Sequence, residues 1–258
     1  MKIKIKDVGV INNAEINISR INVVCGVNSS GKTTASKLLY CYLKDKKLLE
    51  NEGFSNINKS NVEFSSDSSF SDVFYLESIS ILDLKDLHIL NFDHIRHLKE
   101  CLEVENRDFT SNISSKIRSI ISDDCYSSAG IKQIGVIQLL LDNGSLKENS
   151  FLFIDEPESN LHSDWQIKFA EILVLLAKEL NITLYLNSYS PIFIEAISLY
   201  AQYYDLIKST TFYLTKKQEN DKFNFKKISP KNMGEIYENL TRSYDELDNL
   251  KAKILFKE

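Results

Sequence analysis

The sequence is poor in the residues that break a chain or give it unusual flexibility. Of its 258 residues, only 8 are glycine and 3 are proline. This scarcity argues against long flexible linkers and low-complexity segments. No internal repeat is present, so the pattern does not favour a solenoid. A chain of this length can build one large hydrophobic core or two lobes that share one.

Paired cysteines, an excess of basic charge and long apolar runs are also lacking. The 4 cysteines form no Cys-x-x-Cys pair, so neither a zinc site nor a disulfide framework is indicated. The net charge of −5 gives no overall basic character that would favour nucleic acid, although a local basic patch remains open. The longest apolar runs, 134–141 and 173–177, are far shorter than the roughly 20 residues of a membrane-spanning helix. The N-terminus lacks the apolar core of a signal peptide. We therefore expect a cytoplasmic protein with no membrane partner.

Short apolar runs alternate with helical patterns along most of the chain. Runs rich in β-branched and aromatic residues, typical of strands buried in a parallel sheet, cover 21–25, 151–154 and 182–186. Helical spacing of apolar residues follows these runs, at 32–43, 165–180 and 191–200. This alternation predicts an α/β fold with a mostly parallel sheet and helices on both faces.

The remaining segments complete this expectation. Further strands are predicted at 2–6, 14–18, 73–76, 211–214 and 223–228. Further helices are predicted at 82–105 with a break near Asn91, and at 109–121, 132–141, 233–240 and 244–256. The Ser- and Asn-rich stretch 51–72 has little periodicity, so we expect a loop there.

The strongest local signal lies at residues 26–33, where Gly-Val-Asn-Ser-Ser-Gly-Lys-Thr matches the phosphate-binding pattern G-x-x-x-x-G-K-[ST]. Glycine lets backbone N–H groups approach phosphate oxygens without a Cβ clash. Lys32 would supply positive charge, Thr33 would offer a hydroxyl to Mg²⁺, and the next helix directs its positive dipole end at the anion. The residues expected to bind nucleotide are Gly26, Asn28, Ser29, Ser30, Gly31, Lys32, Thr33 and Thr34. The alternative, a chance glycine-rich turn, is disfavoured by the strand before the motif and the helix after it.

A second motif, Asp155 and Glu156, ends the apolar run 151–154. Acidic residues at the end of a buried strand hold Mg²⁺ and activate water in P-loop enzymes. We expect Asp155 to hold the metal together with Thr33, and Glu156 to orient or deprotonate the attacking water. The alternative is that the two acids cap the start of the next helix.

Four segments together resemble one protein family. They are residues 26–33, Asp-Glu-Pro-Glu at 155–158, Ser-Asn-Leu-His at 159–162 and Asn-Ser-Tyr-Ser-Pro at 187–191. They resemble the ABC-type ATPases of the SMC/RecF/OLD group and, within it, the small bacterial AAA-family ATPases that often accompany phage-defence modules. The resemblance covers nearly the whole chain. It implies a P-loop NTPase fold of the ABC-ATPase-head type, with antiparallel N-terminal strands and an inserted helical lobe.

The resemblance also implies the domain organisation and a dimer. It predicts a single domain over 1–258, in which 1–81 and 145–258 form the nucleotide-binding core and about 82–144 form a helical signature lobe. Family members dimerise head-to-tail around two ATP molecules. Ser128 and Gly130 lie where the family has its signature motif, so they would contact the γ-phosphate bound by the other protomer. Ala129 stands where glycine is common, and an ordinary loop is the alternative. Residues 159–162 resemble the loop that crosses the dimer interface.

Two positions depart from the family pattern. Tyr189 stands where the family usually has a histidine that senses the γ-phosphate. A phenol, with a reference pKa of about 10, cannot become a cation near neutral pH, so we expect slow hydrolysis. Transport-type ABC ATPases carry a glutamine between the phosphate loop and the signature, but no glutamine precedes Gln133. Glu77 is the nearest substitute as a metal-side ligand, or else an ordinary acid at a strand end.

Together these features predict a dimeric switch protein that binds ATP with Mg²⁺ and hydrolyses it slowly, with Lys32, Glu156 and Tyr189 as catalytic residues. Neither an effector domain nor a long coiled coil is recognisable. We therefore expect a separate effector protein, such as a nuclease or toxin, in a phage-defence or DNA-related system. The alternatives are a non-catalytic ATP-bound scaffold or inhibitor subunit, an ABC transporter ATPase subunit, and a protein that binds DNA ends. The missing glutamine argues against the transporter.

Overall fold

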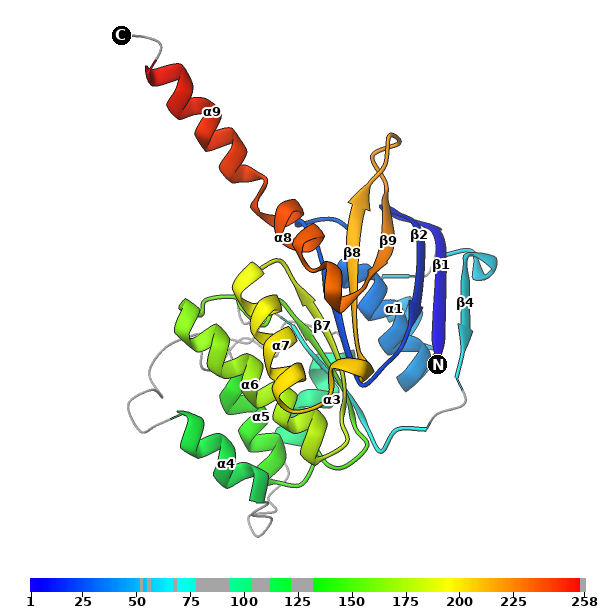
Figure 1. The fold of residues 1–258 in the computed structure, drawn as a ribbon. Helices are drawn as coiled ribbons and strands as arrows, with labels where there is room; N and C mark the ends of the chain where they lie inside the picture. The colour runs from blue at the N-terminus through cyan, green and yellow to red at the C-terminus, as the bar shows by residue number, and fades with distance from the viewer. Residues whose placement is uncertain are drawn as a thin grey trace.

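The computed structural model describes residues 1–51, 53–54, 57–66, 69–77, 93–103, 112–121 and 132–255. Within these residues a single nine-stranded sheet has the order β4-β1-β2-β9-β8-β3-β7-β6-β5 (Figure 1). The strands are β1 (Lys2–Val8), β2 (Ile11–Asn17), β3 (Ile21–Cys25), β4 (Val62–Ser65), β5 (Val73–Leu76), β6 (Phe151–Asp155), β7 (Thr183–Ser188), β8 (Thr210–Lys217) and β9 (Phe223–Ile228).

The sheet has a parallel half and a mixed half. Strands β5, β6, β7, β3 and β8 are all parallel, and β3 lies between β7 and β8. Strand β1 pairs antiparallel with β2 and β4, and β8 pairs antiparallel with β9. Strand β2 joins the two halves by pairing parallel with β9. Every residue of β3, β5, β6 and β7 is buried, which explains why apolar residues predominate in these strands. The predicted α/β architecture with antiparallel N-terminal strands is confirmed.

Helices cover both faces of the sheet. They are α1 (Lys32–Lys44), α2 (Leu48–Asn51), α3 (Asp93–Leu102), α4 (Asn112–Ile121), α5 (Lys132–Asp142), α6 (Ser163–Glu179), α7 (Pro191–Tyr203), α8 (Gly234–Thr241) and α9 (Ser243–Leu255). Short 3₁₀ helices lie at Lys59–Asn61, Ile207–Ser209 and Pro230–Asn232. Helix α1 packs with β1, β2 and one face of the parallel strands, whereas α3 to α8 pack with the opposite face. Alternate residues of each strand therefore enter two separate cores.

The structure corrects the expectation of a loop at 51–72, and it describes only part of the predicted helical lobe. The stretch 51–72 is not wholly a loop, because Val62–Ser65 forms edge strand β4 against β1. Its pattern is weak because only Val62 of the four residues is buried. Of the predicted helical lobe, the structure describes α3, α4 and α5. Residues 78–92, 104–111 and 122–131, which include Ser128 and Gly130, lie outside the described residues. No helix in the described ranges is long and apolar enough to cross a bilayer.

An ionic cluster ties α1, β5 and α3 together. Lys44 Nζ donates to Asp72 Oδ1 at 2.5 Å and lies 2.7 Å from His97 Nε2, which in turn lies 3.2 Å from Asp72 Oδ2. Cys101 Sγ lies 3.6 Å from the same His97 nitrogen. Burial opposes ionisation of Asp72, but hydrogen bonds from His97, Lys44 and the backbone of Val73 hold its pKa below the ordinary value. The ammonium of Lys44 therefore neutralises a carboxylate that fastens α3 to the core.

Candidate phosphate-binding site

The phosphate motif lies at the carboxyl edge of the parallel strands. Residues 26–31 connect the end of β3 to the start of α1, and β7 and β6 end beside them. Ligands of open α/β sheets bind at this edge, where helix N-termini also point. The predicted sequence of buried strand, loop and helix is therefore present.

Two glycines of the loop have conformations and surroundings that exclude a side chain. Gly26 has φ +150°, and a Cβ there would lie 1.8 Å from Thr215 Oγ1. Gly31 has φ +91°, and a Cβ there would lie 2.6 Å from Ile11 Cγ1. Ser30, between them, is buried and accepts a hydrogen bond from Thr215 Oγ1 at 2.9 Å. Both ends of the loop are thus fixed by the strands beneath it.

The tip of the loop is open to solvent. Asn28, Ser29 and Thr33 are exposed, and Thr34 is partly buried. Lys32 is only 4% exposed, and its ammonium donates to the carbonyl oxygens of Gly26 and Val27, both at 2.8 Å. Burial lowers the pKa of Lys32, while Asp155 and Glu156 oppose this shift. Lys32, at the end of the phosphate loop, therefore reaches back and binds the carbonyl oxygens at the start of the same loop.

The two residues predicted to hold the metal are in direct contact. Thr33 Oγ1 donates to Asp155 Oδ2 at 2.7 Å, and Asn187 Nδ2 donates to Asp155 Oδ1 at 2.9 Å. Asn187 also donates to Ser36 Oγ at 2.8 Å, so it links the carboxylate to α1. Burial raises the pKa of Asp155, and the hydrogen bonds from Thr33 and Asn187 oppose the rise. An oxygen pair of this kind suits a hard cation such as Mg²⁺.

The sequence by itself indicates no role for Asn187. Its signal was nevertheless present, because a polar residue near the end of an otherwise apolar buried strand requires a partner. Asn187 is 1% exposed and lies next to Asp155 in the register of β6 and β7. It is a positioning residue for the Asp155 carboxylate.

Glu156 leaves the sheet immediately after Asp155. Its backbone has φ +51°, and its N–H donates to Asn187 O at 2.9 Å. Its partly exposed side chain accepts a hydrogen bond from Ser159 Oγ at 3.1 Å. The two acids do not cap the next helix, because α6 begins at Ser163 and His162 is its N-cap. The capping alternative is therefore wrong.

Glu158 is a second residue whose importance the sequence did not reveal. It is 4% exposed, and its Oε1 accepts from Ser188 Oγ at 2.9 Å, Tyr189 N at 2.7 Å and Ser190 N at 3.1 Å. Burial raises its pKa, while these hydrogen bonds lower it. One carboxylate thus joins the segment after β6 to the segment after β7. Tyr189 is 38% exposed, and partial burial raises the pKa of its phenol.

Glu77, the candidate substitute for the family glutamine, lies just after β5. It is 7% exposed and forms an ion pair with Lys37 of α1. Its negative charge also raises the pKa of Asp155, so the two carboxylates interact electrostatically. Gln133 Nε2 of α5 donates to the Glu77 carbonyl at 3.3 Å. Glu77 is therefore a buried, paired acid beside the site, and its role as a metal-side ligand stays a prediction.

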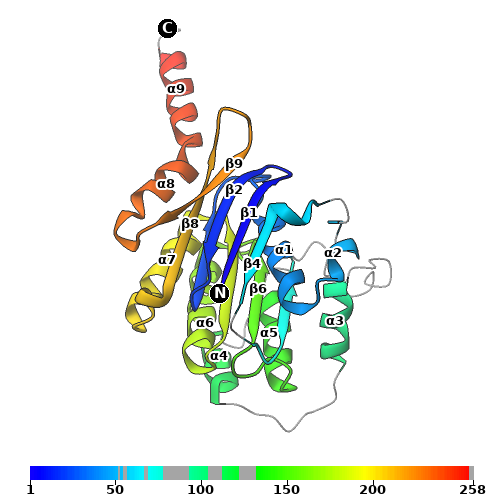
Figure 2. The same cartoon turned by 90° about the vertical axis from the view of Figure 1, so that its right-hand side faces the viewer.

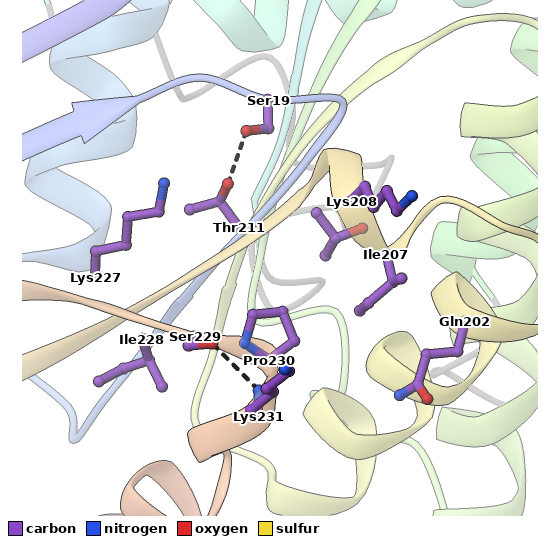
Figure 3. A pocket seen from close by; sticks show the side chains of 11 residues that line it. Ser19, Gln202, Ile207, Lys208, Thr211, Lys227, Ile228, Ser229, Pro230 and Lys231 are labelled. Carbon is purple, nitrogen blue, oxygen red and sulfur yellow. Dashed lines mark hydrogen bonds between the residues drawn. The ribbon is translucent and has the colours of Figure 1, made fainter.

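A pocket of about 770 Å³ lies elsewhere, between α7, β8 and β9 (Figure 3). Ile207, Ile228 and Pro230 contribute apolar surface, and Lys227 and Lys231 are exposed beside it. No residue of the phosphate motif lines this pocket. It is therefore separate from the candidate site.

Solved structures share this arrangement. The SMC head domain from Thermotoga maritima matches with a TM-score of 0.51 at 14% identity, covering 88% of this chain and 98% of that one. An SMC head bound to the C-winged helix domain of ScpA matches with a TM-score of 0.54 at 10% identity, covering 88% and 97%. An ABC transporter in an inward-facing conformation matches with a TM-score of 0.50 at 18% identity, covering 93% and 88%. No protein-family model and no curated protein matches the sequence.

These similarities, with the loop between β3 and α1, define the fold as that of a P-loop NTPase. Within that class, it is the fold of the ABC-type ATPase heads to which SMC heads belong. Identities of this size establish the fold alone.

Proposed function

We propose that this protein binds ATP with Mg²⁺ at residues 26–33 and hydrolyses it slowly as a dimeric switch. The observation that carries the proposal is the contact between Thr33 and Asp155, next to an exposed loop tip and a buried lysine. A hydroxyl and a carboxylate that already meet need little rearrangement to share a cation.

Each residue of the site has a role in this proposal. Lys32 would exchange its bonds to the loop carbonyls for the β- and γ-phosphates. Thr33 and Asp155 would hold Mg²⁺, which supplies charge neutralisation at the phosphates. Glu156 would orient the attacking water, and Tyr189 would lie by the γ-phosphate. The loop residues Gly26, Asn28, Ser29, Ser30, Gly31 and Thr34 would surround the phosphates with backbone and hydroxyl donors.

The switch role extends the proposal to partners. A second protomer would close on the bound ATP through Ser128 and Gly130 of its helical lobe, and hydrolysis would release it. A separate effector, such as a nuclease or toxin of a cytoplasmic phage-defence or DNA-related system, would read the change. This part rests on the family resemblance and not on a contact in the structure.

One observation favours a second candidate function, a scaffold that binds ATP without turnover. Tyr189 presents a phenol where related sites carry an imidazole, and its burial and nearby acids raise its pKa further. The phenol therefore stays neutral and cannot stabilise developing charge as a cation would.

Two substitutions test the site. Lys32→Ala is expected to abolish or strongly weaken MgATP binding in calorimetry, because the only lysine of the loop is lost. Lys147→Ala is its control, since Lys147 is exposed before the opposite end of β6. Unchanged MgATP affinity in Lys32→Ala would overturn the site assignment.

The second substitution, Glu156→Gln, is expected to keep MgATP bound, to stop hydrolysis and to trap a nucleotide-dependent complex in light scattering. Glu148→Gln is the control at the other end of the same strand. Single-turnover hydrolysis by the wild type separates an ATPase from a scaffold. A Glu156→Gln protein that hydrolyses ATP at the wild-type rate contradicts the assigned role.

A further inference from the structure

Helix α9 (Ser243–Leu255) extends away from the rest of the molecule in both views (Figures 1 and 2). It is 13 residues long and none of them is buried. Its large apolar side chains are between 51% and 73% exposed; they are Tyr244, Leu247, Leu250, Ile254 and Leu255. None of them belongs to either hydrophobic core. A helix of this length is marginal in water by itself, so its apolar side chains require a partner surface.

The spacing of these residues matches that of a paired helix. Leu247, Leu250 and Ile254 follow one another at intervals of three and four, which is the pattern of core positions a, d and a in a heptad repeat. With this assignment, Glu246 and Lys253 both occupy position g, beside the apolar stripe. In an antiparallel helix pair, the g positions of one helix lie against the g positions of the other.

The charges of α9 identify a second copy of the same helix as the fitting partner. Its first turn carries Asp245 and Glu246, and its last turn carries Lys253. An antiparallel copy places the acidic end of each helix against the basic end of the other, whereas a parallel copy places like ends together. Lys251 pairs with Asp248 on its own helix at 2.8 Å, but Lys253 has no ion pair among the described residues. Lys253 is therefore available to Glu246 of the second copy.

We propose that α9 is a dimerisation helix that pairs antiparallel with α9 of a second copy, without nucleotide. Leu247, Leu250 and Ile254 form its apolar seam, and Glu246 of each copy pairs with Lys253 of the other. No residue of this seam belongs to the phosphate motif, so the pairing requires no contact with ATP and holds two protomers together with or without it. The inference does not depend on the proposed ATPase function.

The first test measures self-association of the full chain without nucleotide by sedimentation velocity. The wild type is expected to dimerise at micromolar concentration, and Leu247→Gln with Leu250→Gln is expected to weaken the dimer at least a hundredfold. Both side chains are exposed in the protomer, so the substitutions leave its core unchanged. The dimer is expected to persist in Lys32→Ala, which separates it from any complex that ATP induces. A wild type that stays monomeric at about 100 μM, roughly a hundredfold above the expected micromolar dissociation constant, overturns the proposal.

The second test determines the partner orientation by charge reversal. Glu246→Lys is expected to weaken the dimer about tenfold, because two symmetric ion pairs become repulsive. Adding Lys253→Glu to that chain is expected to restore wild-type affinity. Restoration by Lys251→Glu instead would indicate a parallel pair and overturn the antiparallel assignment. A dimer insensitive to all three reversals overturns the pairing itself.

Discussion

Removal of the Glu158 carboxylate should destabilise the protein more than any exposed acid could. In Glu158→Ala, the N–H groups of Tyr189 and Ser190 and the hydroxyl of Ser188 all lose the acceptor Oε1. An unsatisfied buried donor costs about 1–3 kcal/mol. Ser190 N keeps a second hydrogen bond to Ser188 Oγ at 3.2 Å, which reduces the combined cost of the three lost hydrogen bonds. We therefore expect a loss of about 3 kcal/mol in the free energy of unfolding.

Glu158→Gln is the matched variant, because its amide oxygen can still accept these hydrogen bonds. The amide nitrogen would take the place of Oε2, which has no hydrogen-bond partner. We expect a loss of about 1 kcal/mol or less for this variant. Urea unfolding at pH 7 measures both values, with Glu148→Ala as an exposed control. A Glu158→Ala cost below about 1 kcal/mol, or equal costs for alanine and glutamine, would refute the argument that hydrogen bonding to Oε1 holds the two segments together.

Three further predictions concern other parts of the molecule. Tyr189→His should raise kcat up to about a hundredfold with little change in ATP affinity, since an imidazolium can stabilise developing charge; an unchanged or lower kcat in steady-state assays would refute this. Asp72→Asn should cost about 1 kcal/mol at pH 7. Because its folded pKa is depressed, that difference is present above the ordinary value of 3.8 and should shrink in denaturation measured at falling pH below it; a constant difference would count against the ionic cluster. Gly31→Ala should cost about 2 kcal/mol or more and weaken nucleotide binding, whereas Gly53→Ala, at a similar φ of +85° with no atom within 4 Å of its Cβ, should cost less; equal costs would show that packing at Gly31 is unimportant.

Much of the core could be predicted because burial on both faces makes a strand apolar throughout. Strands β3 and β5, in which every residue is buried, match their predicted bounds, and β9 does so although it is only partly buried. Strand β4 was missed because an edge strand with one buried residue has no such signature. Helix α6 begins two residues before its predicted start, because His162, an unusual N-cap, accepts from Asp164 N.

The candidate site also contains residues that could be predicted from the sequence and residues that could not. Lys32, Thr33 and Asp155 come together because parallel strands end at one edge, which is a consequence of fold class. The roles of Asn187 and Glu158 depend on hydrogen bonds to groups about 30 residues away or more, and local patterns carry no information about such pairs. The relation of Tyr189 to a γ-phosphate stays a prediction, because the family position alone suggests it.

The place of β3 in the sheet also determines when the phosphate loop can form during protein synthesis. The loop is encoded near the N-terminus, yet β3 is held between β7 and β8, and β2 is held by β9. The ribosome makes β3 long before either of its neighbours, so this strand has no partner in the sheet until β7 (Thr183–Ser188) has been translated, and it gains its second partner only with β8 (Thr210–Lys217). Contacts between such distant segments form slowly because loop closure opposes them. A nascent chain therefore contains the complete motif during most of its translation but gains a usable nucleotide site only with the last strands.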